Sequence, residues 1–203
     1  MDADEHGYNL WGKMNWIHGR LCRSEWWRKK VRRELLPWVL RGLDLGDYPL
    51  EIGSGPGLTS EVLRLKCTRL TCLEIDPILA AALAARLGSG NVTVQQGDAS
   101  AMPFQDSTFT GAACFTMLHH VPSVQLQDRI LKEACRVIRP GSWLAGSDSK
   151  TSLTFRLIHI GDTMVVCDAD EFGERLVKAG FSDVSVVQSE RAFSFRGRKP
   201  VSA

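Results

Sequence analysis

The chain has 203 residues, of which 44% are hydrophobic and 24% charged, and its formal net charge is +2. This length suits one α/β domain with a full core, and so mild a charge gives no reason to expect a nucleic-acid partner. The six cysteines are scattered without a C-x-x-C pair, and no apolar signal region or membrane span is visible, so we expect a cytoplasmic protein with reduced thiols and no metal site.

The first predicted element is a helix over residues 22–41. Four large side chains share one of its faces, at spacings of four, four and three residues: Trp27, Val31, Leu35 and Trp38. Pro37 is expected to end this helix and to open a second short one. The opposite face carries the basic run "RKKVRR". By default such a run forms a solvent-exposed helix face. The alternatives are that it contacts an anionic membrane surface or RNA.

Strands and helices then alternate along the chain. Strands are expected at residues 48–53, 69–75, 91–97, 107–117 and 142–149, and helices at residues 59–66, 77–87, 123–138 and 168–181. The last helix begins with a capping signature, Asp168 followed by Glu171. Two further strands, at residues 183–188 and 191–199, are joined so tightly that they must be antiparallel.

This alternation predicts a Rossmann-like α/β fold. Its sheet is expected to be doubly wound, seven-stranded and mostly parallel, with helices on both faces and an antiparallel hairpin at one edge. The exposed edge of that hairpin leaves the oligomeric state open.

A glycine-rich loop, "EIGSGPG", follows the first strand of the predicted sheet. Doubly wound folds bind their ligands at this end of the strands. Gly53, Gly55 and Gly57 give a G-x-G-x-G spacing, which allows a tight turn and a close approach of the backbone to a ligand. The dinucleotide fingerprint requires a small residue where this chain has Leu58. The loop therefore disfavours a nicotinamide dinucleotide.

Three carboxylates accompany three successive strands. Glu51 places a negative charge beneath the glycine loop, which is unfavourable for a pyrophosphate and suits a cationic ligand. Glu74, about twenty residues beyond the glycines, can accept both hydroxyls of a ribose. Asp98 and the backbone N–H of Ala99 match the exocyclic amine and a ring nitrogen of adenine. Together they predict a site for a positively charged nucleoside.

On these motifs the chain resembles the class I S-adenosylmethionine-dependent methyltransferases, of the small-molecule branch typified by the quinone-biosynthesis enzymes. The resemblance runs from about Tyr48 to Lys199 and rests on the order of "LEIGSGPG", "LEIDP", "GDASAMPF", "FTMLHHV" and "LKEACRVIRPG". It implies S-adenosylmethionine as the cofactor and S-adenosylhomocysteine as the product. The residues that it assigns to the cofactor are Glu51, Gly53, Ser54, Gly55 and Gly57 for the methionine part, Glu74 and Ile75 for the ribose, Asp98 and Ala99 for the adenine, and the Phe115 backbone for the methionine amino group.

The resemblance further implies in-line methyl transfer to a small molecule at the carboxyl rim of the sheet, and an apolar acceptor is compatible with it. His119, beside His120 after the fourth strand, is a candidate for the base that takes the acceptor's proton, with a structural role as the alternative. Two other functions stay open: a non-catalytic module that binds the cofactor or its product, and a nicotinamide-dependent oxidoreductase, which Leu58 disfavours.

Members of this family usually cover the acceptor with an insertion after the fifth strand, but residues 150–167 are too short for a domain. We therefore assign residues 1–45 to an N-terminal helical lid segment, and residues 46–203 to one compact cofactor-binding domain. Packing onto that domain is the default for the tryptophans of the lid segment. Three of its aromatic residues are candidates for a wall over the acceptor: Tyr8, Trp11 and Trp16.

Overall fold

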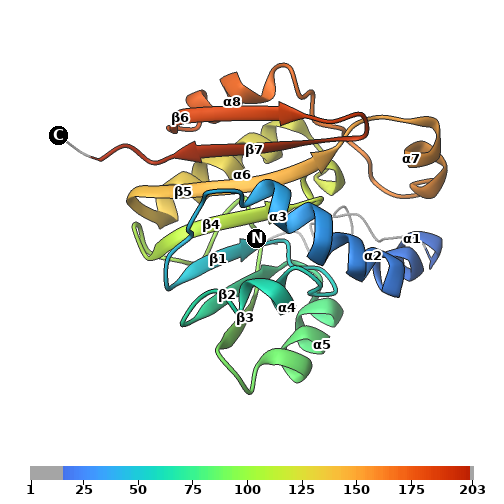
Figure 1. Ribbon diagram of the computed structural model, residues 1–203, viewed down its shortest axis with the longest axis horizontal. Coiled ribbons are helices and arrows are strands. Elements are labelled where there is room, and N and C mark those ends of the chain that lie inside the picture. Colours follow the sequence, from blue (N-terminus) through green and yellow to red (C-terminus); the bar gives the residue numbers. More distant parts are fainter. Residues whose placement is uncertain (1–15, 202–203) are drawn as a thin grey trace, which may run out of the picture.

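The computed structural model describes residues 16–201, within which seven strands form one sheet (Figure 1). The strands are β1 (Pro49–Ile52), β2 (Leu70–Glu74), β3 (Val92–Gln96), β4 (Phe109–Phe115), β5 (Ile138–Ser149), β6 (Ser182–Gln188) and β7 (Ala192–Arg198). Their order across the sheet is β3-β2-β1-β4-β5-β7-β6, and β7 is antiparallel to both of its neighbours. The predicted mostly parallel α/β sheet with an antiparallel edge hairpin is thereby confirmed.

Helices cover both faces of the sheet (Figure 1). Before the sheet come α1 (Trp16–Cys22), α2 (Glu25–Lys30), the π-helical segment η2 (Val31–Leu35) and α3 (Leu36–Val39). The others are α4 (Ser60–Leu63), α5 (Pro77–Leu87), the 3-10 turn η3 (Leu118–His120), α6 (Val124–Val137), α7 (Leu153–Ile158) and α8 (Phe172–Lys178). Among the described residues, no helix combines the length and the apolar composition that a membrane crossing requires.

The core consists of two apolar clusters, one on each face of the sheet. In β4, Ala112 and Cys114 belong to the cluster that includes α6 and α8, whereas Ala113 and Phe115 belong to the cluster that includes α3, α4 and α5. Such alternation is expected when both faces of a strand are buried. The run of small and apolar residues in β4 therefore reflects its place at the centre of the sheet.

The strand order reverses between β1 and β4, which lie side by side with Ile52 opposite Cys114. The helix that follows β1 and the helix that follows β4 consequently pack on opposite faces. The loops after these two strands, residues 53–59 and 116–121, separate at this point and leave a crevice between them. Doubly wound folds hold their ligands at this topological switch point.

The N-terminal helix differs from the prediction in two places. It is interrupted at Ser24, whose hydroxyl caps α2 by accepting a hydrogen bond from the Trp27 N–H. It also does not end at Pro37, because the backbone continues from α2 through η2 into α3, with the Leu36 N–H donating to the Val31 carbonyl. We attribute this wider π turn to Pro37, which has no N–H for the helical ladder and crowds the preceding turn.

Three other boundaries also differ from the prediction. Helix α4 is shorter than residues 59–66, and β5 begins at Ile138 rather than at residue 142. The capping signature at Asp168 is not used, because α8 begins only at Phe172 and Glu171 makes no capping bond through its side chain. Instead, the Asp168 carboxylate accepts the Asp170 N–H at 2.8 Å in a local turn. Such turns compete with helix caps for the same carboxylate.

Gln127 of α6 connects three segments: the turn after β4, the stretch before α8, and α8 itself. Its side chain is fully buried, and Nε2 donates to the carbonyls of Leu118, at 3.0 Å, and Val165, at 2.8 Å. Its Oε1 accepts a hydrogen bond from Arg175 at 2.9 Å. Replacement of Gln127 by leucine removes all three of these hydrogen bonds, and the one to the Leu118 carbonyl is fully buried, so we expect a loss of about 2–4 kcal/mol in the free energy of unfolding. Urea denaturation of the wild type and the variant measures this loss.

The matched control for this substitution is Gln125→Leu, because Gln125 lies on the exposed side of the same helix. We expect that variant to stay within about 0.5 kcal/mol of the wild type. Equal unfolding free energies for the two variants would show that the Gln127 hydrogen bonds do not hold these three segments together.

Candidate functional site

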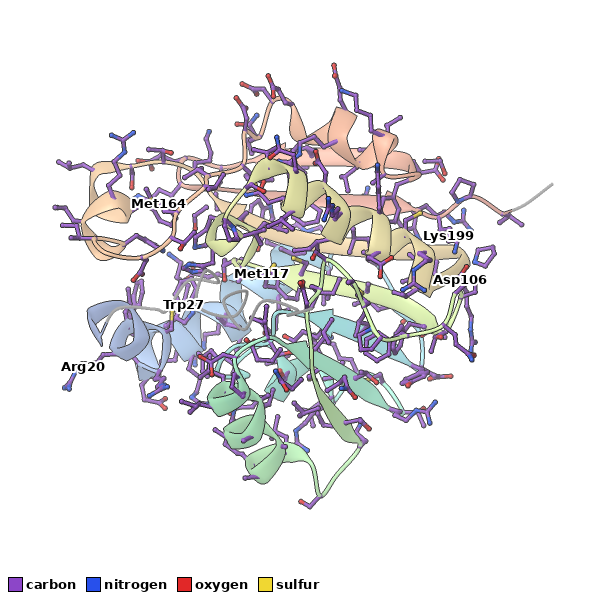
Figure 2. The ribbon with its side chains drawn as sticks, turned by 180° about the vertical axis from the view of Figure 1, so that it is seen from behind. Arg20, Trp27, Asp106, Met117, Met164 and Lys199 are labelled. Atoms are coloured by element: carbon purple, nitrogen blue, oxygen red, sulfur yellow. The ribbon has the colours of Figure 1, made fainter. Side chains whose placement is uncertain are left out.

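A cavity of about 1130 Å³ lies at the carboxyl edge of the parallel strands. Its wall is formed by the glycine loop after β1, the end of β2, the turn after β4, the run from α2 to α3, and α7. Figure 2 shows Trp27 and Met117 on this side of the molecule, and Asp106 and Lys199 at the opposite edge. Since ordinary ligand pockets occupy about 300–1,000 Å³, the cavity has room for a nucleoside cofactor and a second small molecule.

The three glycines of the loop all have left-handed backbone angles, with φ of +68° at Gly53, +52° at Gly55 and +79° at Gly57. A Cβ atom would lie 2.8 Å from the Met117 side chain if built on Gly53, and 2.3 Å from Leu83 Cδ1 if built on Gly57. A Cβ on Gly55 meets nothing within 4 Å, and Gly55 lines the cavity. The first and last glycines thus allow close packing, and the middle one exposes bare backbone to a ligand.

Glu74, at the end of β2, is buried and lies on the cavity wall. Its Oε2 accepts the Gly55 N–H at 2.6 Å, and its Oε1 accepts the Asp76 N–H at 3.0 Å. Burial raises the pKa of Glu74, and these backbone donors oppose the rise. The carboxylate therefore fixes the glycine loop to the end of β2, and each oxygen keeps a second lone pair for a ligand hydroxyl. Ile75 lines the cavity beside it.

Glu51 lies behind the glycine loop and is not part of the cavity wall. It is 1% exposed, and its carboxylate accepts hydrogen bonds from the Thr59 hydroxyl and, at 2.5 Å, from the Ser60 hydroxyl. Burial raises the pKa of Glu51, and the hydroxyl donors act in the opposite direction. In the structure Glu51 thus organises the start of α4. Ser54 of the same loop is buried and lines the cavity.

The two residues predicted for the adenine are placed differently from each other. Ala99 is buried and lines the cavity together with Gly97. Asp98 is half-buried, and its Oδ1 accepts the Ser100 N–H at 2.7 Å. Its side chain is not among the cavity-lining groups. The structure therefore brings the backbone of this loop to the cavity and directs the Asp98 carboxylate to the loop itself.

Helix α6 holds the loop after β3 in position. Glu133 Oε2 accepts the Met102 N–H at 2.7 Å, and Arg136 donates to the Met102 carbonyl at 3.0 Å and the Phe104 carbonyl at 2.7 Å. Arg136 also bonds both oxygens of Glu133 and thereby lowers the pKa of that carboxyl below its ordinary value of 4.5. The pair clamps the loop that the sequence assigns to adenine recognition.

This clamp predicts a loss of stability in acid. Because the pKa of Glu133 is lowered in the folded state, its contribution is complete above pH 4.5 and is lost as the pH falls through the folded pKa. We expect Glu133→Gln to cost about 1 kcal/mol of unfolding free energy at pH 7, and this difference to shrink as the pH falls below 4.5. Asp106→Asn is the control, since that partner of Arg136 is 75% exposed. A difference that is independent of pH would contradict the clamp.

Phe115 ends β4 and lines the cavity, and the chain turns sharply after it. Thr116 has a left-handed φ of 48°, an unusual angle for a β-branched residue, and its N–H donates to the Ser147 carbonyl at 2.8 Å. This turn carries Met117 against Gly53. The Met117 side chain therefore reaches across the crevice and packs against the first glycine of the loop.

His119 follows in η3 and forms a buried pair with Asp148 of β5. Its Nδ1 lies 2.5 Å from Asp148 Oδ1, and its backbone N–H donates to Asp148 Oδ2 at 3.2 Å. Both side chains are almost inaccessible to solvent, and His119 lines the cavity. Asp148 was not among the residues singled out from the sequence, although it also sits near the carboxyl end of a strand. The criterion that singled out Glu74 and Asp98, a carboxylate near the carboxyl end of a strand, could also have identified Asp148.

The segment after β5 contributes to the cavity more than its length suggests. Its helix α7 and the residues around that helix place Ser152, Phe155 and His159 on the wall. His159 Nδ1 lies 2.7 Å from the Phe155 carbonyl. These residues were missed because nothing in the local sequence shows that this segment turns toward the cavity at the carboxyl edge of the sheet (Figure 1).

The run from α2 to α3 supplies the other side of the cavity. The stripe predicted for this helix lies on the cavity wall: Trp27, Val31, Leu35 and Trp38. Of the predicted aromatic wall, Tyr8 and Trp11 lie outside the described residues, as does the side chain of Trp16. In the basic run, Arg28 pairs with Glu61 beside the glycine loop. The exposed members of the run are Lys29, Arg32 and Arg33.

Comparison with known proteins shows that the chain is similar to methyltransferases. Residues 50–146 match the family described as "Methyltransferase domain". The chain is 30% identical over 155 residues to a probable ribosomal RNA small subunit methyltransferase A of Natronomonas pharaonis, covering 73% of this chain and 50% of the relative. It is 28% identical over 120 residues to a demethylmenaquinone methyltransferase of Staphylococcus aureus, covering 57% and 46%. The chain thus spans about half the length of these curated relatives.

The fold is also that of solved methyltransferases. The N-methyltransferase NodS of Bradyrhizobium japonicum, solved with S-adenosylhomocysteine, superposes with a TM-score of 0.67 at 20% identity, and the match covers 94% of each chain. The matched family segment contains the glycine loop, Glu74 and the turn after β4. Residues 50–146 thus match a methyltransferase domain, and the fold that carries them is that of solved S-adenosylmethionine-dependent methyltransferases.

Proposed function

We propose that the protein transfers the methyl group of S-adenosylmethionine to a small acceptor held in the same cavity. The observation that carries this proposal is the continuity of the cavity, which extends from Gly55 and Glu74 to the aromatic side chains of Trp38 and Phe155. One end offers backbone and carboxylate groups, and the other offers large apolar surfaces. A cofactor and an acceptor can therefore lie next to each other in one enclosure.

The cofactor fits the polar end. Glu74 would accept the ribose hydroxyls through its remaining lone pairs, and the bare backbone at Gly55 leaves room for close contact. The Phe115 backbone would hold the methionine amino group, and the Ala99 backbone the adenine, whereas the Asp98 carboxylate holds the shape of this loop through the Ser100 N–H. When bound, the cofactor supplies a sulfonium methyl group that is already activated for transfer. The protein's share of the catalysis is then alignment and exclusion of water, and alignment alone can be worth about 7–11 kcal/mol.

The charge of the wall favours a small acceptor over a polynucleotide. The permanently basic residues among the described lining groups are Lys30, Lys150 and Arg191, and they are matched by the acidic residues Glu34, Glu74, Asp76 and Glu190. A polynucleotide site would instead need an excess of lysine and arginine. One relative is named for methylation of demethylmenaquinone, which supports an apolar acceptor for this chain. The other is named for methylation of ribosomal RNA, so RNA is the competing acceptor.

A transfer assay with S-adenosylmethionine labelled in its methyl group tests the proposal. The acceptors are a reduced naphthoquinone, a phenol, a small primary amine and total RNA. We expect label in a small-molecule product, and we expect Leu35→Arg to lower its yield at least about tenfold by placing a charge at the apolar end. Leu65→Arg is the matched control, because Leu65 is 68% exposed and not part of the cavity wall. Label in RNA alone would overturn the small-molecule acceptor.

We extend the proposal to the site of action, a cytoplasmic membrane surface. All six cysteines are free thiols, as in a reducing compartment. Lys29, Arg32 and Arg33 are exposed near Trp26, which is 60% exposed, and basic and aromatic groups together favour an anionic lipid surface.

Sedimentation with lipid vesicles measures this contact. We expect the protein to bind phosphatidylglycerol vesicles and not phosphatidylcholine vesicles. The double variant R32E/R33E should lose at least about tenfold in affinity, since each basic residue contributes about 1 kcal/mol at such a surface. Equal binding to both lipids, or to neither, would remove the membrane from the account.

A further inference from the structure

Three histidine side chains meet on the wall of the cavity: His119 and His120 from η3, and His159 after α7. One ligand atom from each lies within 4.8 Å of the other two. The ring centroids are 4.1 Å apart for His119 and His120, 5.1 Å for His119 and His159, and 5.4 Å for His120 and His159. Two of the rings are buried. The fold, and not local sequence, brings the third histidine to the other two.

His119 is held in the orientation of a metal ligand. Asp148 Oδ1 lies 2.5 Å from Nδ1, which places the ring proton on Nδ1 and leaves Nε2 with a lone pair. His119 is 2% exposed, and its Nε2 is buried with no hydrogen-bond partner among the described residues. A buried nitrogen of this kind requires an explanation. A carboxylate on one ring nitrogen and an open lone pair on the other is the pattern of histidines that bind metal ions.

His159 is oriented through its Nδ1 by a different outer partner. Its Nδ1 lies 2.7 Å from the Phe155 carbonyl, so that the proton on Nδ1 is donated and Nε2 is its ligand atom. Backbone carbonyls are, with carboxylates, the usual outer partners of metal-binding histidines. The Phe155 carbonyl belongs to α7, so the helix fixes the orientation of the ring.

We propose that His119, His120 and His159 form a binding site for a divalent cation of the zinc class, with an open coordination position toward the cavity. Three neutral imidazoles suit Zn²⁺, Co²⁺, Ni²⁺ and Cu²⁺, whereas Mg²⁺ and Ca²⁺ require oxygen ligands. Sites with three protein ligands keep a fourth position for water or substrate, unlike closed structural sites with four. No metal site follows from the sequence alone, because His159 is remote from the histidine pair.

The cation would define the class of acceptor, and this part of the inference rests on the proposed function. An acceptor that reacts through a hydroxyl oxygen or a thiol sulfur can bind the cation at the open position in its deprotonated form, as an alkoxide, phenolate or thiolate. Its proton passes to solvent on binding, because a bound cation lowers the pKa of such a group. The lone pair of His119 Nε2 is then used for coordination, so His119 acts as a ligand and not as the base predicted from the sequence.

Metal titration of the full chain tests the site without any assay of activity. Protein stripped with a chelator is titrated with Co²⁺, followed by visible absorption, and with Zn²⁺, followed by calorimetry. We expect one equivalent to bind with micromolar or tighter affinity and a tetrahedral Co²⁺ spectrum. His119→Ala and His159→Gln should each weaken binding at least about a hundredfold, and Asp148→Asn about 10–100-fold.

Cys22→Ser is the matched control, because Cys22 lines the same cavity outside the histidine cluster and burial raises the pKa of its thiol to about 11. We expect that variant to bind the metal as the wild type does. Thermal unfolding verifies that each variant is folded. If His119→Ala does not fold, His159→Gln still tests the site. Failure of the wild type to bind at micromolar metal, or undiminished binding by His159→Gln, overturns the site. S-adenosylhomocysteine binding without metal binding would overturn the site alone and leave the proposed function standing.

Discussion

Replacement of Glu74 by alanine is expected to weaken the binding of S-adenosylhomocysteine at least about a hundredfold, or about 2.7 kcal/mol. The carboxylate has two tasks in the account. It accepts the N–H groups of Gly55 and Asp76, which hold the glycine loop to β2, and it would accept the ribose hydroxyls through charge-assisted hydrogen bonds. Calorimetric titration of the folded variant measures the loss.

Two further variants make this result specific. Glu74→Gln keeps the shape of the side chain but offers a single acceptor oxygen, so we expect a loss between those of wild type and alanine. Glu190→Gln removes another carboxylate from the cavity wall, one whose side chain is 87% exposed, and should stay within about threefold of the wild type. Unchanged affinity in a folded Glu74→Ala variant would remove Glu74 from the ribose.

Substitution of Gly146 by alanine is expected to destabilise the protein by more than about 4 kcal/mol. A Cβ atom at this position would lie 2.2 Å from the Cys114 carbonyl oxygen and 2.4 Å from Phe195 Cζ. Gly146 pairs with both residues, so it is enclosed by β4 on one side and β7 on the other. Neither strand can move without breaking the ladder at the centre of the sheet. We expect the unfolding midpoint to fall by about 10 °C or more.

Gly173→Ala is the matched control for this loss. Gly173 lies in α8, and a Cβ there would meet only Val184 and Val186, each at 3.8 Å, which is ordinary contact. Alanine should therefore be neutral or stabilise the helix by up to about 1 kcal/mol. A midpoint for Gly146→Ala within about 2 °C of the wild type would contradict the packing described for β5.

The sheet could be predicted because its determinants are local. Alternating runs of strand and helix, and the tight connection before β7, fix a parallel sheet with an antiparallel edge. The N-terminal helix was less predictable, because its course depends on a single capping hydroxyl at Ser24 and on how the chain accommodates Pro37. Such alternatives differ by about a kcal/mol, so tertiary packing decides between them.

The cofactor end of the cavity was predictable for a similar reason. Gly53, Glu74 and Phe115 each lie at the end of a strand, and parallel strands end at the same edge. The position of Glu51 behind the loop could also have been inferred, since it alternates with residues that face the other cluster. The contacts of His159 could not have been inferred, because they depend on the path of α7 beside the carboxyl edge of the sheet (Figure 1).

The central claim is that the glycine loop and Glu74 bind an adenosyl-sulfur cofactor. It is tested most directly by calorimetric titration of the purified protein with S-adenosylmethionine, S-adenosylhomocysteine and NAD in parallel. We expect micromolar binding of the first two compounds, with one molecule bound per chain, and no heat of binding from NAD. Binding of NAD without binding of either adenosyl-sulfur compound would contradict it.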